Sequence, residues 1–116
     1  MRDLLLQSAG VLAIAVSLIH GVLSETKVFA HITIEPPRFR TLVHVVWQAG
    51  TVAWICGGVL LLAAPSMSSE PARRWIVVVV AVMYATAVVA NAWATRGRHF
   101  GWMLFSLVVA LAVAGY

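Results

Sequence analysis

The sequence predicts an all-α fold, an integral membrane bundle of four helices. The chain has 116 residues, of which 62% are hydrophobic and only 10% are charged. A soluble domain of this size could not hide so much apolar surface, because small domains leave a large fraction of their surface exposed. The apolar residues also fall into four runs of bilayer length. We therefore expect one membrane domain, residues 1–116, with helices at about 4–23, 41–64, 72–95 and 99–116.

The first apolar run predicts a membrane span over about residues 4–23. It follows Arg2 and Asp3 and contains no Asp, Glu, Lys or Arg. A secretory signal is the alternative, but a run that reaches Leu23 is long for the apolar part of a signal peptide. We therefore interpret this run as a retained helix.

The motif His20-Gly-Val-Leu-Ser-Glu25 ends the first span and precedes the only long polar stretch, residues 27–40. It places an imidazole about one turn inside the membrane boundary and a carboxylate at the edge. If the helix continues outward, four polar residues share one face at helical spacing. These are His20, Ser24, Lys27 and His31.

The second span begins after Pro36-Pro37 and is closed by Pro65, since proline interrupts a helix interior. Trp47, near the boundary, is expected to be an interfacial anchor. Cys56, the only cysteine, is interpreted as a small apolar side chain. Two stripes follow helical spacing, one polar or small (His44, Gln48, Thr51, Gly58) and one small-xxx-small (Ala49, Ala53, Gly57).

The third span is rich in valine, but lipid admits only helices and closed barrels, and runs of this length are too long for barrel strands. Pro71 suits its first turn, with Ser69 or Glu70 as the N-cap. Arg96-Gly97-Arg98 forms a tight link, so the third and fourth spans should be an antiparallel hairpin. The third span has a polar face of Tyr84, Asn91 and Thr95, and the fourth has a close-packing stripe of Ser106, Ala110 and Ala114.

The Lys and Arg residues lie in the connections and predict the orientation. Loops 24–40 and 96–98 carry five, whereas the opposite side carries Arg2, Arg73 and Arg74. The positive-inside rule therefore predicts that both termini lie outside and that both loops are cytoplasmic. No basic face with interleaved aromatic residues is present, so we expect membrane lipid and no nucleic acid as a partner.

Four antiparallel spans would bring most of the polar side chains of the apolar runs to one boundary. A charge at the bilayer centre costs roughly 2.5–3.5 kcal/mol on insertion scales, and polar groups therefore face the bundle interior. Each residue alone could be an ordinary boundary residue or helix cap, but together they predict a shared polar pocket. The expected pocket residues are His20, Glu25, His44, Gln48, Asn91 and His99, with Ser24, Thr51, Tyr84, Thr95 and Arg98 in a secondary role.

Imidazole and carboxylate groups suit a metal ion such as Zn, Fe or Cu, and two facing histidines suit haem b. No His-x3-His or Glu-x2-His spacing fixes a site, however. Acid–base catalysis by His20 and Glu25 is a further alternative. The two residues lie about 140° apart on a helix and have no nucleophile beside them. Whether the chain is an enzyme stays open.

Three functions remain in view. The first is a small binding or accessory subunit whose pocket holds a metal ion, haem or a polar headgroup. The second is a structural subunit of a larger membrane complex, in which the small-residue stripes are protein contacts. The third is an enzyme or carrier that acts on a lipid-soluble substrate such as a quinone. Four short spans leave little internal space, so we expect a homo-oligomer or a partner protein.

Three motifs carry a resemblance to a known group of proteins. They are His20-x4-Glu25, Trp47-Gln48-x5-Trp54 and Arg98-His99-x2-Trp102. With these motifs the chain resembles a set of small, uncharacterised bacterial four-span membrane proteins. In that group a histidine usually takes the place of Gln48, and a proline often takes the place of Phe100. The resemblance implies the fold and the location of the site. We expect the protein in a bacterial inner membrane.

Overall fold

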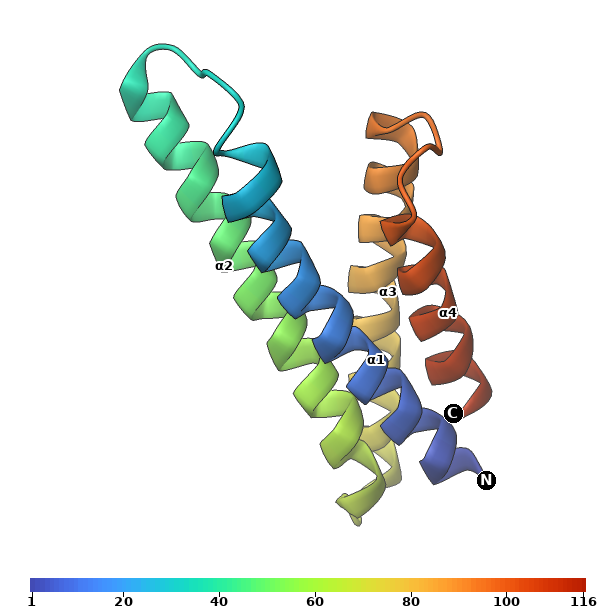
Figure 1. The fold of residues 1–116 in the computed structure, drawn as a ribbon. Coiled ribbons are helices and arrows are strands. Elements are labelled where there is room, and N and C mark those ends of the chain that lie inside the picture. The colour runs from blue at the N-terminus through green and yellow to red at the C-terminus, as the bar shows by residue number, and fades with distance from the viewer.

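The computed structural model describes all 116 residues, Met1–Tyr116, and confirms the all-α fold class (Figure 1). The chain contains no strand. A π-helix, Ser24–Val28, continues the first helix outward, as the spacing of its polar residues allowed, and a short 3-10 turn, Ala64–Ser66, follows the second. The helices are α1 (Arg2–Leu23), α2 (Pro37–Ala63), α3 (Glu70–Ala94) and α4 (Gly101–Ala114).

Three of the helical segments are long and apolar enough to cross a membrane, so the protein is membrane-embedded. They comprise α1 with the π-helix, α2 with the 3-10 turn, and α3. The helix α4 has 14 residues. At 1.5 Å per residue it is about 21 Å long, which is less than the roughly 30 Å of a hydrocarbon core.

The fourth helix is shorter than the expected 99–116 because the link before it uses more residues. Arg96 and Gly97 both have positive φ, at 51° and 74°. Glycine reaches this left-handed region without strain, which permits the tight link that the sequence predicted. His99 and Phe100 therefore lie before the first turn of α4. His99 is thus a loop residue.

The other helix ends follow the expected turn chemistry. The second helix begins at Pro37, four residues earlier than expected, because proline is well suited to the first helical position. The third helix has Ser69 as its N-cap, and the Ser69 hydroxyl accepts a hydrogen bond from the Ala72 N–H at 3.4 Å. Pro71 lies in its first turn, as predicted.

The four helices form two antiparallel hairpins, α1–α2 and α3–α4. The hairpins are joined mainly through α1 and α4, while α2 and α3 contact each other little. They converge at the end that holds both chain termini and diverge at the end that holds the loops after α1 and α3 (Figure 1). The space between the hairpins therefore lies at the boundary where the sequence placed its polar residues.

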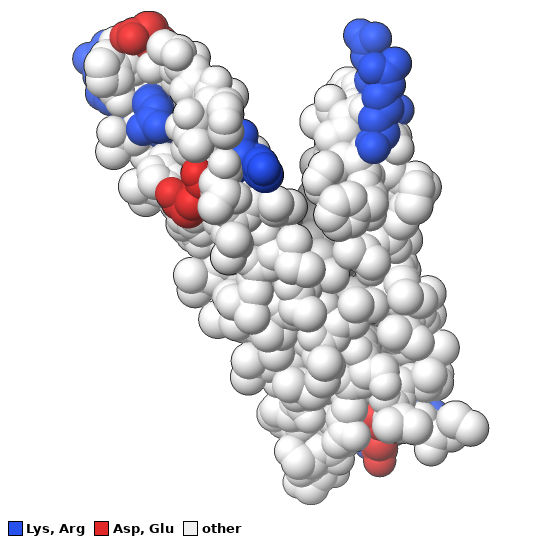
Figure 2. Space-filling model, viewed as in Figure 1, with Lys and Arg blue, Asp and Glu red and all other residues white.

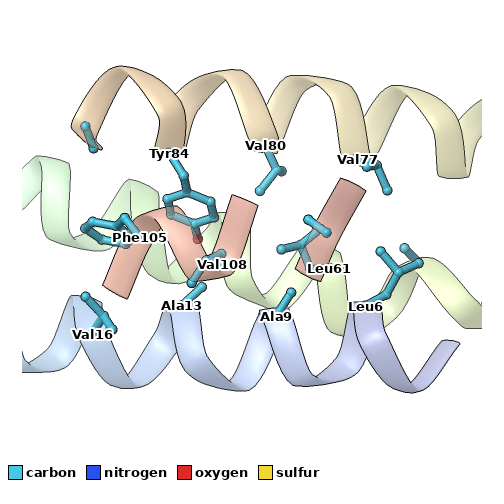
Figure 3. Packing of buried hydrophobic residues seen from close by; sticks show 13 residues of the cluster. Leu6, Ala9, Ala13, Val16, Leu61, Val77, Val80, Tyr84, Phe105 and Val108 are labelled. Carbon is cyan, nitrogen blue, oxygen red and sulfur yellow. The ribbon is translucent and has the colours of Figure 1, made fainter. Parts of the chain in front are cut away.

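The buried core fills the half of the bundle nearer the termini. Figure 3 shows its side chains pointing inward from α1 and α3, with Tyr84 and Phe105 at the end nearer the divergence. Small residues on α1 allow the neighbouring helices to come close. The core consists of Leu6, Ala9, Ala13, Val16, Leu61, Ala64, Val77, Val80, Tyr84, Ala87, Phe105, Val108 and Ala112.

The helices α1 and α2 approach each other closely at Gly10 and Gly58. A Cβ atom added to Gly10 would lie 2.7 Å from the Gly58 carbonyl oxygen, so neither position has room for a side chain. Of the small-residue stripes that the sequence suggested, Gly57 is an internal contact: it is buried, and a Cβ atom added there would lie 3.0 Å from the Tyr84 hydroxyl oxygen. The alanines of these stripes do not make internal contacts. Ala49, Ala53, Ala110 and Ala114 are exposed on the outer surface of the bundle.

Candidate functional site

A cavity of about 240 Å³ lies between the two hairpins where they diverge. Figure 2 shows the two arms separating above this region, with Lys and Arg side chains near both tips. No Asp, Glu, Lys or Arg lines the cavity. Its polar and aromatic lining comes from all four α-helices and from the link between α3 and α4. These residues are His20, Trp47, Trp54, Asn91, Thr95, His99, Phe100 and Phe105.

His20 is held in this cavity by two tryptophans and a threonine. Its ring stacks on Trp47 with a centroid separation of 4.7 Å and an interplanar angle of 9°. Trp54 packs against it at 4.6 Å with a tilt of 58°. The Nδ1 atom of His20 lies 2.9 Å from Oγ1 of Thr51. The imidazole is therefore fixed in position and orientation.

The two contacts of the Thr51 hydroxyl favour one proton position on His20. The hydroxyl donates its own hydrogen to the Trp47 carbonyl at 3.3 Å. Because the hydroxyl has a single hydrogen, both contacts are hydrogen bonds at the same time only when His20 donates through Nδ1–H. In neutral His20 the Nε2 atom is therefore unprotonated. It makes no hydrogen bond within the chain and offers an acceptor to the cavity.

His99 has the opposite arrangement. The backbone N–H of Gly101 donates to its Nδ1 atom at 3.0 Å, so this nitrogen must be the acceptor. Neutral His99 then carries its proton on Nε2, which makes no hydrogen bond within the chain. The ring also stacks on Phe100 at 4.7 Å. His99 therefore offers a donor to the cavity, and its Nδ1 caps the first turn of α4.

Asn91 and Thr95 place two further polar side chains along the cavity. Thr95 donates its hydroxyl hydrogen to the Asn91 carbonyl at 2.7 Å and is thereby satisfied. The Asn91 side chain makes no hydrogen bond, and its Oδ1 atom is buried without a partner. The Nε1 atom of Trp47 is also buried without a partner. Unpaired buried polar atoms are rare, and each calls for an explanation such as a bound ligand or water.

The other predicted residues form a separate network on the outside of the α1–α2 hairpin. The Glu25 carboxylate accepts hydrogen bonds from Nε2 of His44 at 2.5 Å and from Nε2 of Gln48 at 2.6 Å. The same Gln48 nitrogen lies 2.8 Å from Oγ of Ser24. None of these four residues lines the cavity. This network ties the π-helix to α2 and fixes the arm on which His20 stands.

The structure therefore divides the predicted pocket in two. His20, Asn91, Thr95 and His99 line the cavity, with Thr51 behind His20. The remaining predicted residues, Ser24, Glu25, His44, Gln48, Tyr84 and Arg98, lie outside it. Trp47, which the sequence suggested as an interfacial anchor, lines the cavity, where its ring supports His20 and its Nε1 is buried.

Tyr84 belongs to the core below the cavity. It is fully buried, its ring stacks on Phe105 at 5.1 Å, and its hydroxyl donates to the Trp54 carbonyl at 2.5 Å. We predict that Tyr84→Phe lowers the free energy of unfolding by about 1 kcal/mol, the usual net value of one hydrogen bond. Ligand binding should stay unchanged. Denaturation followed by circular dichroism in detergent, beside a binding assay, measures both. A loss of binding at unchanged stability would contradict this role.

The geometry gives little support to a metal held by these side chains. No three His, Cys, Asp or Glu side chains are grouped closely enough to hold a metal ion. His20 has the usual arrangement of a ligand, with Nδ1 donating and Nε2 free. His99 does not, because coordination through Nε2 would require a proton on Nδ1, where the Gly101 N–H already donates. The same argument applies to haem b held by both histidines.

Four aromatic residues of the site, Trp47, Trp54, Phe100 and Phe105, were not singled out from the sequence as site residues. Trp54 follows Trp47 by seven positions and so lies on the same face of α2, which is a signal that could have identified it. Phe105 packs edge-on against Trp54 at 4.8 Å. Nothing in the spacing of the last apolar run distinguishes Phe105 from its neighbours.

Comparisons with protein-family models, with curated proteins and with solved structures found no match to this chain. The resemblance to small bacterial four-span membrane proteins therefore stays a prediction, and the function must be argued from the site itself.

Proposed function

We propose that this protein is a small membrane binding subunit whose cavity holds the polar head of a lipid-soluble molecule. The observation that carries the proposal is the cavity itself, in which fixed imidazoles from α1 and from the link before α4 meet aromatic walls. Ligand sites are typically apolar with a few placed polar groups, and this cavity has that composition. The partnerless amide of Asn91 supports a ligand that completes its hydrogen bonds.

The size and place of the cavity favour a headgroup. About 240 Å³ is slightly below the roughly 300–1,000 Å³ of sites for drug-sized ligands. An apolar tail would therefore remain in the lipid that surrounds the diverging hairpins. We further propose the inner membrane of a bacterium, with loops 24–40 and 96–98 in the cytoplasm. The Lys and Arg side chains near both arm tips support this orientation (Figure 2).

Filling the cavity tests the proposal. Ala87 is buried and lines the cavity, so Ala87→Leu places three further carbon atoms in the binding space. We predict that the lipid-soluble molecule extracted from the purified wild type, measured by mass spectrometry, falls at least about tenfold in this variant. Ala90→Leu is the matched control, since Ala90 lies on the same helix and is exposed. Equal amounts in both variants would reject the proposal.

A structural subunit is the second candidate. Ala49, Ala53 and Cys56 are exposed along the outer surface of α2, and small residues allow another membrane helix to approach closely. Cross-linking through Cys56 in native membranes tests this reading. A cross-linked product of fixed mass that persists when the cavity is filled by Ala87→Leu would favour it.

A further inference from the structure

The two histidines of the cavity offer opposite hydrogen-bonding atoms, and this selects a ligand class. We infer that the cavity binds an aromatic hydroxyl group, the headgroup of a quinol or a related phenol. The inference rests on the proposed function, since it requires the cavity to be a ligand site. It adds which chemistry the site prefers and which oxidation state of a quinone-type molecule it selects.

The hydrogen-bond pattern comes from the contacts behind each ring. When both contacts of the Thr51 hydroxyl are hydrogen bonds, His20 is an acceptor at Nε2, and the Gly101 N–H makes neutral His99 a donor at Nε2. A hydroxyl group both accepts and donates, so one hydroxyl can pair with either histidine or with both. A quinone carbonyl only accepts and leaves the His20 nitrogen without a partner. A methyl ether also has no hydrogen to donate.

The walls favour an aromatic ring beside that hydroxyl. Trp47 and Trp54 pack against His20, Phe105 packs edge-on against Trp54, and Phe100 stacks on His99. Aromatic rings gain from offset-stacked and edge-to-face contacts beyond the area that they bury. An aliphatic alcohol would satisfy the histidines but would use none of these contacts.

The charge of the lining argues against an anionic headgroup. No Lys or Arg lines the cavity, and the basic side chains at this end of the bundle lie toward the tips of the arms. A phosphate or carboxylate in the cavity would lose its water without gaining a cationic partner, which is costly. A neutral hydroxyl carries no such penalty.

The test compares three matched ligands on the wild-type protein in lipid nanodiscs without oxygen. They are a para-quinol with a short alkyl tail, its dimethyl ether and the corresponding quinone, each titrated by quenching of tryptophan fluorescence and by calorimetry. We expect the quinol to bind about tenfold more tightly than either of the other two, because each leaves the His20 nitrogen unpaired.

Two substitutions test which histidine is responsible for the preference for the quinol. His20→Phe and His99→Phe keep an aromatic ring in each position and remove the acceptor or the donor. His20→Phe should weaken quinol binding about tenfold and leave the affinity for the dimethyl ether nearly unchanged. His99→Phe should weaken the binding of both, because the ether oxygen also accepts a hydrogen bond from His99. The wild-type comparison needs no variant, so it decides the inference even where a variant fails to fold.

The outcomes separate this inference from the proposed function. Equal affinity for the three ligands, or tighter binding of the quinone, overturns the hydroxyl assignment. So does the absence of binding by all three when Ala87→Leu still removes a co-purified molecule, and in both cases the binding function stands. If Ala87→Leu removes no molecule and none of the three ligands binds, the proposed function fails as well.

Discussion

Replacement of Gly58 by alanine is expected to lower the free energy of unfolding by about 1–3 kcal/mol, the usual cost of overpacking a tight contact. The new Cβ atom would lie 2.7 Å from Cγ1 of Ile14 and 2.9 Å from the Gly10 carbonyl oxygen. A backbone oxygen cannot rotate away as a side chain can. The two helices must therefore separate by several tenths of an ångström along their crossing.

Gly50 provides the matched control on the same helix. A Cβ atom added at Gly50 meets nothing within 4 Å. Alanine at this position should therefore stabilise the protein by about 0.5–1 kcal/mol, since glycine is the poorer helix former. Both variants can be measured by denaturation in detergent with circular dichroism. If Gly58→Ala were as stable as Gly50→Ala, the close crossing of α1 and α2 would be wrong.

The same crossing positions the candidate site. His20 lies on α1 beyond Gly10, and its partners Thr51, Trp47 and Trp54 lie on α2. A shift of one helix against the other would pull the imidazole away from the threonine and from the stacked indole. We therefore expect Gly58→Ala to weaken ligand binding together with stability, whereas Gly50→Ala should change neither the site nor its ligand.

Much of the fold could be predicted because lipid restricts a chain strongly. Bilayer-length apolar runs must be helices, and prolines and glycines mark their ends. Ser69 caps α3 and Pro37 opens α2, in accord with ordinary capping chemistry. The length of α4 was harder to predict from the sequence, because it depends on how many residues the turn at Arg96 and Gly97 uses before a new helix begins.

The site was predicted less completely, since depth in the membrane is easier to read than rotation about a helix axis. His20 and Glu25 share a boundary but lie about 140° apart. His20 consequently faces the cavity, whereas Glu25 faces outward to His44 and Gln48. The proton positions on His20 and His99 depend on contacts with Thr51 and Gly101, and no sequence spacing reveals these.

Replacement of Asn91 by leucine is expected to stabilise the protein and to impair the site. The Oδ1 atom of Asn91 is buried without a hydrogen-bond partner. Leaving such a group unpaired costs about 1–3 kcal/mol, and a leucine of similar shape removes that cost. In the ligand-bound protein the amide can pair with the headgroup, so the variant should lose about tenfold in affinity for the molecule that the wild type retains.

Thr95→Val is the control one turn further along the same helix. The Thr95 hydroxyl already donates to the Asn91 carbonyl. Removing this hydroxyl therefore eliminates no unpaired polar group and should give no gain in stability. Thermal denaturation and ligand extraction on both variants measure the two effects. A structural asparagine would show the reverse pattern, with lower stability and unchanged ligand content. Greater stability together with lost binding is typical of a polar group that folding leaves unpaired and that binding satisfies.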